Sequence, residues 1–267
     1  MESKFPKIQI IVATHKKYMM PTDKMYLPLQ VGAEGKKDLG YARDNVGENI
    51  SEKNASYCEL TGLYWAWKNL DADYLGLVHY RRHFGRKRGK TLKGVLSYQD
   101  LYLMTEKYKI FVPKKRRYFV ESLYSHYDHT HYAEHLDITR SIIEEKYPQY
   151  LSSFDKIMKH TYGYMFNMCI MRRDYFDKYC TWLFEILFEL ERHVDAKNLS
   201  TFQGRFFGRV SEIIFNVWID TLLQSGELSK HELKELPYFH VERINWLKKG
   251  SAFLEAKFAH QKYKGSF

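Results

Sequence analysis

Short apolar runs alternate along the chain with stretches in which apolar residues recur at helical spacing. The apolar runs have the length and the aliphatic character of strands that are buried inside a sheet. The expected strands cover residues 7–14, 74–79, 110–112 and 162–171. The expected helices cover residues 56–70, 98–108, 138–147, 175–193 and 212–223. This alternation predicts an α/β domain with a mostly parallel central sheet that is flanked by helices.

The ends of these elements carry local signals. Ser56 and Glu59 have the spacing of a capping box at the start of the first helix. Ser211 is expected to cap the last helix. The polar stretch after the first strand contains several prolines and glycines and is expected to be a loop. Residues 1–240 are expected to form one domain, and residues 241–267 a basic, aromatic and amphipathic tail that packs on the domain or lies at a membrane surface.

The composition excludes several classes of protein. The chain has 267 residues, of which 45% are apolar and 28% charged, so it is neither disordered nor fibrous. Three cysteines without a CxxC pattern predict neither a disulfide framework nor a thiolate zinc site, and they fit a reducing compartment. No apolar run approaches the length of about 18 residues that spans a membrane. We therefore expect a cytoplasmic protein that touches a membrane from outside if it touches one at all.

The net charge of +10 is concentrated in blocks. Seven basic residues and no acidic one lie between His79 and Gln99, and six lie between Lys107 and Arg117. Such blocks attract the phosphates of a nucleotide, a nucleic acid or a lipid headgroup, or they form a solvated surface. No zinc-finger, RNP or KH pattern accompanies them, so nucleic acid is not an expected partner. The GxGxxG and P-loop patterns are also missing from the sequence.

The densest group of hydrogen-bond donors is the motif His79-Tyr80-Arg81-Arg82. It follows an expected buried strand, and ligands of open α/β sheets bind beyond the carboxyl ends of the strands. Because arginine forks fit pairs of phosphate oxygens, the motif is a candidate for holding a diphosphate, with a basic surface turn as the alternative. Thr14 and His15 stand at the end of the first strand in the same way.

Four histidines lie within ten residues, namely His126, His129, His131 and His135. His131 and His135 are four residues apart, which on a helix places both on one face and could form a metal site. A loop that binds sugar hydroxyls and a solvated loop are the alternatives. A metal-dependent phosphodiesterase that uses residues 126–135 is therefore a rival function.

Polar residues elsewhere add further candidates. Glu212 stands at an expected helix start, where the helix dipole would keep it ionised as a general base, or where it would serve helix electrostatics alone. Asp44, Asn45 and Asn49 lie in the polar stretch. They are candidates for contacts with a base or a ribose, with turn formation as the alternative.

Several motifs, taken together, resemble those of a known family. They are Asn49-Ile-Ser-Glu-Lys-Asn54, Cys58-Glu-Leu-Thr-Gly-Leu-Tyr-Trp-Ala-Trp-Lys-Asn69, Tyr74-Leu-Gly-Leu-Val-His-Tyr-Arg-Arg82 and Phe166-Asn-Met-Cys-Ile-Met-Arg-Arg173. The chain is similar, over nearly its whole length, to a bacterial capsular and exopolysaccharide glycosyltransferase family that was long catalogued as a domain of unknown function. Some members of that family are regarded as galactofuranosyltransferases.

The resemblance implies a GT-A-like fold with a helical C-terminal part. It also implies an inverting transfer of a hexosyl unit, galactofuranose or galactose, from a UDP-sugar to a lipid-linked oligosaccharide. The implied acceptor is a polyprenyl-diphosphate-linked glycan at the inner face of a bacterial membrane. In many GT-A enzymes an Asp-x-Asp motif at a strand end holds Mn or Mg on the donor diphosphate. The motif 79–82 takes that position here, so we expect its cations to replace part of the metal's charge. A phosphoglycan-binding or nucleic-acid-binding module without activity is the remaining alternative.

With this resemblance, the candidate residues fall into three sets. The catalytic set is Glu212, as the general base, and Asp137. The donor-binding set is Thr14, His15, Asp44, Asn45, Asn49, Lys68, His79, Tyr80, Arg81 and Arg82. The acceptor-binding set is His131, His135 and Asn167. No residue is assigned as a metal ligand.

Overall fold

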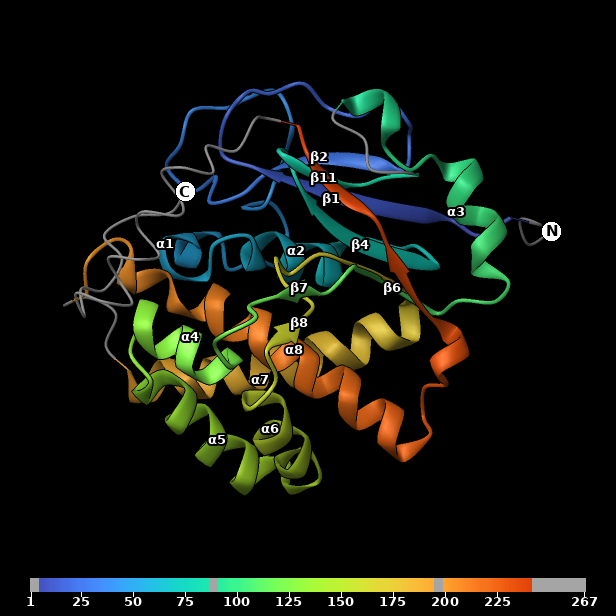
Figure 1. Cartoon of the computed structure of the whole chain (residues 1–267). Coiled ribbons are helices and arrows are strands. Elements are labelled where there is room, and N and C mark those ends of the chain that lie inside the picture. Colours follow the sequence, from blue (N-terminus) through green and yellow to red (C-terminus); the bar gives the residue numbers. More distant parts are fainter. Residues whose placement is uncertain (1–4, 87–90, 195–198, 242–267) are drawn as a thin grey trace.

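The protein is built around one large sheet, which a computed structural model describes together with its helices for residues 5–86, 91–194 and 199–241 (Figure 1). The strands of this sheet are β1 (Ile8–Thr14), β2 (Tyr26–Gln30), β3 (Ala42–Arg43), β4 (Tyr74–His79), β5 (Arg82–Phe84), β6 (Ile110–Pro113), β9 (Cys169–Arg172), β10 (Leu233–Leu236) and β11 (Tyr238–His240). A separate small sheet pairs β7 (Arg116–Arg117) with β8 (Tyr162–Gly163).

The large sheet is mostly parallel. Its strands lie in the order β10-β6-β9-β4-β1-β2-β3, and β4, β1, β2 and β3 run parallel to one another. β6 and β10 are also parallel, whereas β9 runs antiparallel to both of its neighbours, β4 and β6. β5 turns back from β4 and pairs with β11. The mostly parallel sheet that the sequence predicts is therefore confirmed.

Helices and loops cover both faces of this sheet. The helices are α1 (Asn54–Tyr57), α2 (Leu60–Asn69), α3 (Tyr98–Thr105), α4 (Leu123–Thr130), α5 (Glu134–Lys146), α6 (Leu151–Met158), α7 (Arg173–His193) and α8 (Phe206–Ser225). Ile10 and Val12 of β1 belong to the core on the side of α3, whereas Ile11 and Ala13 belong to the larger core with α2 and α4–α8. Alternate side chains of a strand point to opposite faces, so a strand that is apolar throughout is buried on both sides.

β2 lies in the stretch that we expected to be a loop, so that expectation was wrong. Val31 N–H donates to Thr14 O at 2.9 Å, which shows that the odd-numbered residues of this segment bond to β1. Alternate residues of a parallel strand bond to alternate sides, so Pro28 faces the side of β3. β3 begins opposite Leu29, so no strand lies beside Pro28 on that side. The lack of an N–H at Pro28 therefore costs no hydrogen bond between strands.

The expected helix 56–70 is interrupted at Cys58, which has a φ of +54° and separates α1 from α2. The Ser56 hydroxyl donates to a backbone carbonyl three residues earlier at 3.2 Å, so the expected capping box does not form. Glu59 is consequently available for another contact, and its carboxylate accepts a hydrogen bond from Asn167.

Two other element boundaries differ from the sequence prediction. The expected strand 162–171 is divided into β8 and β9, because Phe166 and Asn167 have φ values of +78° and +53° that do not continue a strand. The last helix begins at Phe206, five residues before Ser211. Ser211 therefore lies inside α8 instead of capping it, and its hydroxyl donates to Asn167 Oδ1 at 2.9 Å.

None of the helices in the described ranges is both long and apolar enough to cross a membrane. Residues 242–267 lie outside the described residues, and they make up nearly all of the expected tail 241–267. The division into a domain and a tail, and the placement of that tail, therefore stay predictions.

Candidate active site

The carboxyl ends of β1 and β4 lie side by side and present a group of cationic side chains. The two strands pair in parallel with Ala13 opposite His79, so the residues that follow them meet at one edge of the sheet. Lys16 Nζ lies 5.3 Å from the centre of the Tyr80 ring, and the guanidinium carbon of Arg81 lies 4.9 Å from the same point. Tyr80 is buried and thus forms the platform on which both cations rest.

We call the exposed group at this edge the cationic rim, and it consists of His15, Lys16, Arg81 and Arg205. The His15 ring contacts the Tyr80 ring edge-on, with 5.3 Å between the ring centres. Partial burial lowers the pKa of His15, and the charges of Arg81, Lys16 and Arg205 lower it further. Lys16, Arg81 and Arg205 are therefore permanent cations near the His15 ring, which stays neutral near pH 7. This arrangement suits an anion with several oxygens.

The motif 79–82 forms the turn of a hairpin and does not act as one cluster. His79 and Arg82 lie directly opposite each other on β4 and β5, and opposite residues share a face of the sheet. Arg81 lies in the turn and belongs to the cationic rim. The sequence interpretation, in which four neighbouring residues hold one diphosphate, is therefore corrected to two separate groups.

Arg82 is turned into the protein. Its Nε donates to His240 Nε2 at 3.0 Å, and its guanidinium carbon lies 3.8 Å from the centre of the Phe166 ring. Burial lowers the pKa of Arg82 to about 10, and the carboxylates of Glu212 and Glu59 act against this shift. Arg82 therefore remains charged at neutral pH and lies close to two acidic side chains.

Asn167 joins three segments that are far apart in the sequence. Its Nδ2 donates to Glu59 Oε1 at 2.8 Å and to Gly208 O at 3.0 Å. Its Oδ1 accepts the Ser211 hydroxyl at 2.9 Å. Asn167 is 6% exposed, so its amide fixes the start of α2 against α8 and is not open to a large ligand.

The backbone around Asn167 is in a conformation that side chains rarely adopt. Cys58, Phe166 and Asn167 all have positive φ, and in the described ranges only Phe119 joins them among residues other than glycine. Phe166 O accepts a hydrogen bond from His79 Nε2–H at 2.6 Å. Such left-handed residues cost about 1–3 kcal/mol each and cluster at functional sites, so they support a site at this position.

Glu212 and Arg209 lie one turn apart on α8, with Arg209 Nη1 3.2 Å from Glu212 Oε1. Glu212 is 7% exposed and lies in the second turn of the helix. The expectation that Glu212 starts a helix was therefore wrong, because α8 begins at Phe206. The Glu212 carboxylate is paired with the Arg209 guanidinium group instead of lying at a helix end. Burial would lower the pKa of Arg209, but the Glu212 and Glu59 carboxylates raise it.

The side chains that influence one another here form what we call the charge cluster: Glu59, His79, Arg82, Arg209 and Glu212. Burial lowers the pKa of His79, which leaves two carboxylates and two guanidinium groups whose formal charges cancel. Uptake of a proton by one of its carboxylates would leave this cluster with one net positive charge.

Tyr118 connects the charge cluster to the histidine-rich segment. Burial raises the pKa of Tyr118 to about 12, and the charges of Arg116, Glu212 and Arg209 also act on it. Its ring centre lies 4.3 Å from that of His126.

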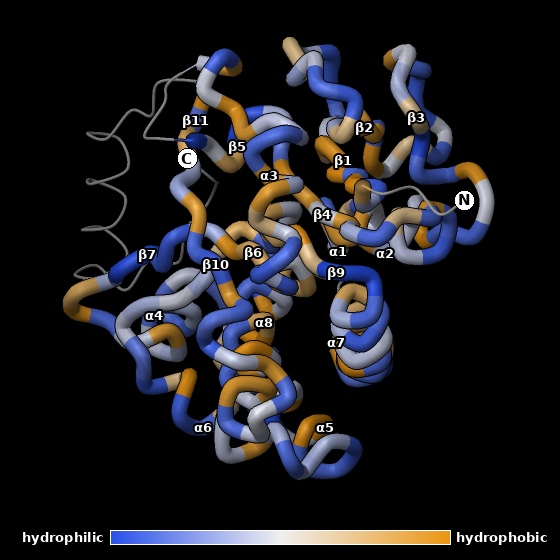
Figure 2. The backbone as a smooth tube through the Cα atoms, turned by 90° about the vertical axis from the view of Figure 1, so that its right-hand side faces the viewer, coloured by the Kyte–Doolittle hydropathy of each residue, from blue (hydrophilic) through white to orange (hydrophobic). Residues whose placement is uncertain are grey.

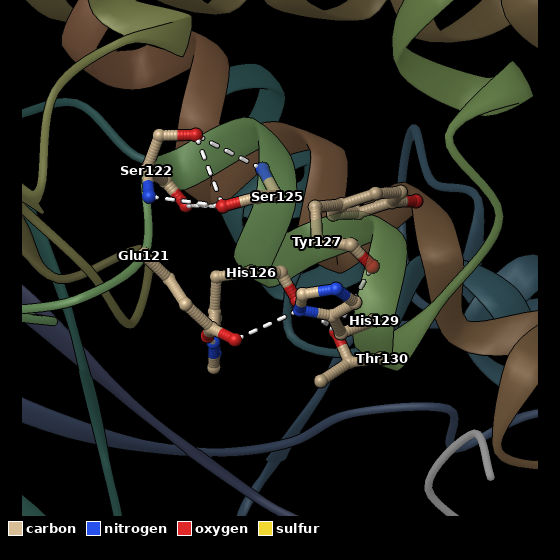
Figure 3. A network of polar contacts seen from close by, with 7 residues as sticks. All are labelled: Glu121, Ser122, Ser125, His126, Tyr127, His129 and Thr130. Atoms are coloured by element: carbon tan, nitrogen blue, oxygen red, sulfur yellow. Dashed lines mark hydrogen bonds and ion pairs between the residues drawn. The ribbon is translucent and has the colours of Figure 1, made fainter. Parts of the chain in front are cut away.

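The histidine-rich segment is organised around Glu121 (Figure 3). His126 Nδ1–H donates to Glu121 Oε2 at 2.7 Å and His129 Nδ1–H to Glu121 Oε1 at 2.8 Å. Burial acts against the charged form of Glu121, but these hydrogen bonds lower its pKa. The described residues contain no group of three or more His, Cys, Asp or Glu side chains that could hold a metal ion.

His131 and His135 do not share a helix face, because α4 ends at Thr130 and α5 begins at Glu134. His131 is 3% exposed and its Nδ1–H donates to Gln203 Oε1 at 2.9 Å. His135 is 2% exposed and stacks on an aromatic ring of α8 at 4.0 Å. Both rings are buried, and the prediction that they contact an acceptor stays a prediction.

The polar stretch before α1 holds candidates that the structure assigns to the fold. Asp44 is fully buried and accepts four hydrogen bonds from within the chain, which leaves it closed to a nucleotide. Asn49 makes a turn, because its Nδ2 donates to Gly47 O at 2.8 Å. Asn45 Nδ2 donates to a glutamate carboxylate at 3.1 Å, and its buried Oδ1 has no partner within the described residues. Thr14 is 1% exposed, and its hydroxyl donates to a backbone carbonyl of the adjoining turn at 2.7 Å.

Lys68 and Asp137 are not brought to this edge of the sheet. Lys68 lies on the last turn of α2, about 13 Å along the helix from Glu59, and its ammonium group is 3.8 Å from the centre of the Trp67 ring. α2 runs back towards the start of β4, so Lys68 lies away from the ends of β1 and β4, and its predicted contact with the donor stays a prediction. Asp137 is exposed on the first turn of α5 and accepts the Tyr124 hydroxyl at 2.9 Å.

Sequence reasoning missed Arg209, Arg205 and the site role of Glu59. Glu59 was assigned to a capping box that does not form. Arg209 and Glu212 have the i, i+3 spacing of a helical ion pair, and this signal was available in the sequence. The sequence analysis did not use this spacing, because the helix was expected to begin at Glu212 and Arg209 was therefore placed outside it.

Acidification is expected to destabilise the fold through His131. Burial and the charge of Arg209 lower its pKa from 6.5 to about 3. Because this pKa lies below the unfolded value, the stabilisation is fully present above pH 6.5 and is lost as the pH falls towards 3. Between pH 6 and 4, His131 should contribute a loss of about 1.4 kcal/mol in unfolding free energy per pH unit. Denaturant titration at several pH values measures this slope.

The variant His131→Phe keeps a flat ring beside Phe202 and removes the titrating group. In this variant the unfolding free energy should change with pH less steeply than in the wild type, by about 1.4 kcal/mol per pH unit between pH 6 and 4. The exposed His231→Gln is the matched control and should leave the slope unchanged. Equal slopes in His131→Phe and the wild type would contradict the assignment.

Comparison with known proteins gives two findings. The sequence matches the family described as domain of unknown function (DUF4422) over residues 9–224. The fold is similar to the solved apo structure of WbbM, a bifunctional glycosyltransferase, with a TM-score of 0.80 and 31% sequence identity. That similarity covers 89% of this chain and 46% of the other, so this chain spans about half the length of the structure that it matches. Comparison with curated proteins gives no match.

Proposed function

The chain belongs to the family described as domain of unknown function (DUF4422), and from this premise we propose that it is a glycosyltransferase that uses a nucleotide-sugar donor. The observation that carries the proposal is its similarity, over most of the chain, to a bifunctional glycosyltransferase. Because this chain spans about half of that structure, we propose one transfer reaction. The cationic rim and the charge cluster, which both lie near the end of β4, are the groups that such a reaction needs.

The cationic rim is the proposed site for the donor diphosphate. Lys16, Arg81 and Arg205 supply three positive charges at the carboxyl edge of the sheet, which is where ligands of open α/β sheets bind. Their charge offsets the negative charge that grows on the diphosphate as it leaves. A UDP-sugar, with galactofuranose or galactose as the hexosyl unit, is the donor that we propose from the resemblance of the sequence motifs.

The charge cluster is the proposed site of acceptor activation. An acceptor hydroxyl oxygen attacks the anomeric carbon of the donor sugar and forms the new glycosidic bond. The bond from that carbon to the diphosphate oxygen breaks, and the nucleoside diphosphate leaves with the electron pair. Glu212 takes the proton of the hydroxyl as general base, and inversion at the anomeric carbon follows from this single displacement.

Neighbouring side chains position Glu212 for this step. Arg209 pairs with the carboxylate of Glu212. Arg82 lies on β5, and its guanidinium group lies over the ring of Phe166. The amide of Asn167 ties α8 to the start of α2, which fixes the distance between Glu212 and Glu59. Asn167 was expected to contact the acceptor directly, and we now propose it as a positioning residue.

A resident Mn or Mg ion on the diphosphate does not fit the side chains at the end of β4. Arg81 stands there beside His15 and Lys16, and these cationic groups repel a metal ion that needs oxygen ligands. The carboxylates of Glu59 and Glu212 are already bound by Asn167 and Arg209. We therefore derive no step through a metal.

The proposed acceptor is a polyprenyl-diphosphate-linked glycan, and the proposed location is the inner face of a bacterial membrane, where capsular or exopolysaccharide chains are assembled. Both come from the resemblance of the sequence motifs.

UDP and UDP-sugars should raise the melting temperature of the protein in the presence of EDTA. A ligand that binds only the folded state adds about 2.7 kcal/mol of stability at a concentration 100 times its Kd. Arg81→Ala removes one cation of the rim and should reduce the shift. Lys107→Ala is the matched control, because it also lowers the net charge by one but lies just before β6, at the opposite edge of the sheet. Thermal melts with each nucleotide measure the effect.

The same melts test the alternatives. A shift that appears only after Mn or Mg is added would contradict the metal-free site. Stabilisation by oligonucleotides and not by any nucleotide sugar would favour the non-enzymatic binding module. An equal reduction of the shift by Arg81→Ala and Lys107→Ala would show that the rim does not bind the diphosphate.

A further inference from the structure

A short segment beside the charge cluster combines basic and apolar side chains, most of which are exposed. It consists of Lys114, Lys115, Arg116, Arg117, Tyr118, Phe119 and Val120, and we call it the basic-apolar tip. Phe119 is 83% exposed and Val120 is 72% exposed, the two highest values for large apolar side chains within the described ranges. Figure 2 shows the bend after the hydrophilic β7 as a hydrophobic projection at the edge of the molecule.

The exposure of Phe119 is built into the backbone. Val120 N–H donates to Tyr118 O at 2.7 Å and closes a three-residue turn in which Phe119 has a φ of +59°. A bulky residue rarely adopts this conformation, which persists only where the surrounding structure enforces it. Tyr118 N–H is held by Thr161 O at 2.8 Å, next to the pairing of β7 with β8. The fold thus holds two apolar side chains in water and away from its own core.

The charges around the tip favour an anionic surface. Four of its seven residues are basic, and Lys114, Lys115 and Arg117 are exposed. Glu235 lies 4.0 Å from Lys115 Nζ and balances one of these charges. Glu121 follows the tip in the sequence, but it is buried and accepts hydrogen bonds from two histidines. An excess of positive charge therefore surrounds the apolar end.

We propose that the basic-apolar tip docks onto an anionic lipid bilayer, with Phe119 and Val120 in the interface and the basic side chains at the headgroups. Apolar burial and attraction to anionic lipids act together on such segments. A stable protein partner would bury about 800 Å² on each side, far more than two side chains offer. Residues 243–267 carry six basic residues and one acidic residue. Because this tail and the tip are both basic, charge does not favour binding of the tail to the tip.

The tip adjoins the place where the proposed acceptor reacts. Tyr118 belongs to the tip, and the charges of Glu212 and Arg209 act on its hydroxyl. Docking would therefore hold the charge cluster close to the bilayer surface, where the sugar of a lipid-linked acceptor lies. This last step rests on the proposed function, but docking itself does not.

Co-sedimentation of the full chain with vesicles tests the proposal without any nucleotide or acceptor. The protein should bind phosphatidylcholine vesicles that contain phosphatidylglycerol, should bind pure phosphatidylcholine weakly, and should dissociate as salt is raised. The double variant Phe119→Asn with Val120→Ser should lower the partition coefficient at least about tenfold. Asn is chosen because it tolerates positive φ, so the turn can persist. Arg117→Gln should lower binding about fivefold.

Leu103→Ser, on the exposed face of α3, is the matched control and should bind as the wild type does. Melting temperatures of all variants show that the fold is kept. Wild-type binding by the double variant would overturn the proposal and would assign any vesicle binding to another part of the chain, such as residues 242–267. Equal binding to neutral and anionic vesicles would overturn it as well. A protein that binds vesicles through the tip but transfers no sugar would leave this inference intact and contradict the proposed function.

Discussion

Replacing Glu212 with glutamine is expected to lower the transfer rate by about 10²–10⁴-fold, the range that general base catalysis contributes. Glutamine has the same shape and can still accept a hydrogen bond from Arg209, so the helix and its neighbours should stay in place. It cannot take the proton of the acceptor hydroxyl. The cationic rim is built from other residues, so the melting-temperature shift with UDP-sugar should be unchanged. Transfer assays and thermal melts on the same preparation measure both quantities.

Asp137→Asn is the matched control for this variant. Asp137 was the other catalytic candidate in the sequence, and it is exposed on α5 beside Tyr124. We expect its removal to leave the rate near that of the wild type. If Asp137→Asn abolished transfer while Glu212→Gln did not, the base assignment would be reversed. If Glu59→Gln abolished transfer and Glu212→Gln did not, the base would be the second carboxylate of the charge cluster.

Replacing Asp44 with alanine is expected to lower the unfolding free energy by about 3 kcal/mol or more, since each buried donor that loses its partner costs about 1–3 kcal/mol. The donors to its carboxylate are Gly32 N–H at 2.8 Å, Ala33 N–H at 3.0 Å, the Ser51 hydroxyl at 2.5 Å and the Thr61 hydroxyl at 2.6 Å. These groups join the loop after β2 to the short 3-10 helix Ser51–Lys53 and to α2. Denaturant titration measures the loss.

Asp38→Ala provides the comparison for a carboxylate that is exposed. Asp38 accepts one hydrogen bond, from Gly40 N–H at 2.6 Å, and its loss should cost about 1 kcal/mol or less. The folded fraction of Asp44→Ala should still respond to UDP-sugar. Wild-type stability of Asp44→Ala together with a lost nucleotide response would instead restore the donor-binding role that the sequence suggested.

The family and the fold class could both be predicted from the sequence. The motifs around residues 49–82 and 166–173 indicated a glycosyltransferase-like family formerly of unknown function, and the family match over residues 9–224 and the similar solved structure confirm this resemblance. The mostly parallel α/β sheet was predicted from short apolar runs that alternate with helical patterns, and it is confirmed. The roles of individual site residues stay proposals that the variants above test.

Errors at the level of elements arose where a local signal depended on distant structure. Pro28 indicated a loop, but it lies in β2 at a point where β3 does not reach. Ser56 and Glu59 had the spacing of a capping box, but a turn at Cys58 separates them into two helices. In both cases the local residue pattern was present in the sequence. The position of β3 and the contact of Glu59 with Asn167, which depend on distant parts of the chain, determined the structure that formed.

The sequence by itself determined which segments are buried, because burial follows from the periodicity of apolar side chains within a few residues. It also determined that β1 and β4 end in polar and basic residues. Only the tertiary structure decided which of those residues act together. Glu59 meets Asn167 across 108 positions, and Arg82 meets His240 across 158. Contacts of such separation depend on the packing of the whole sheet and its helices, and no local pattern encodes them.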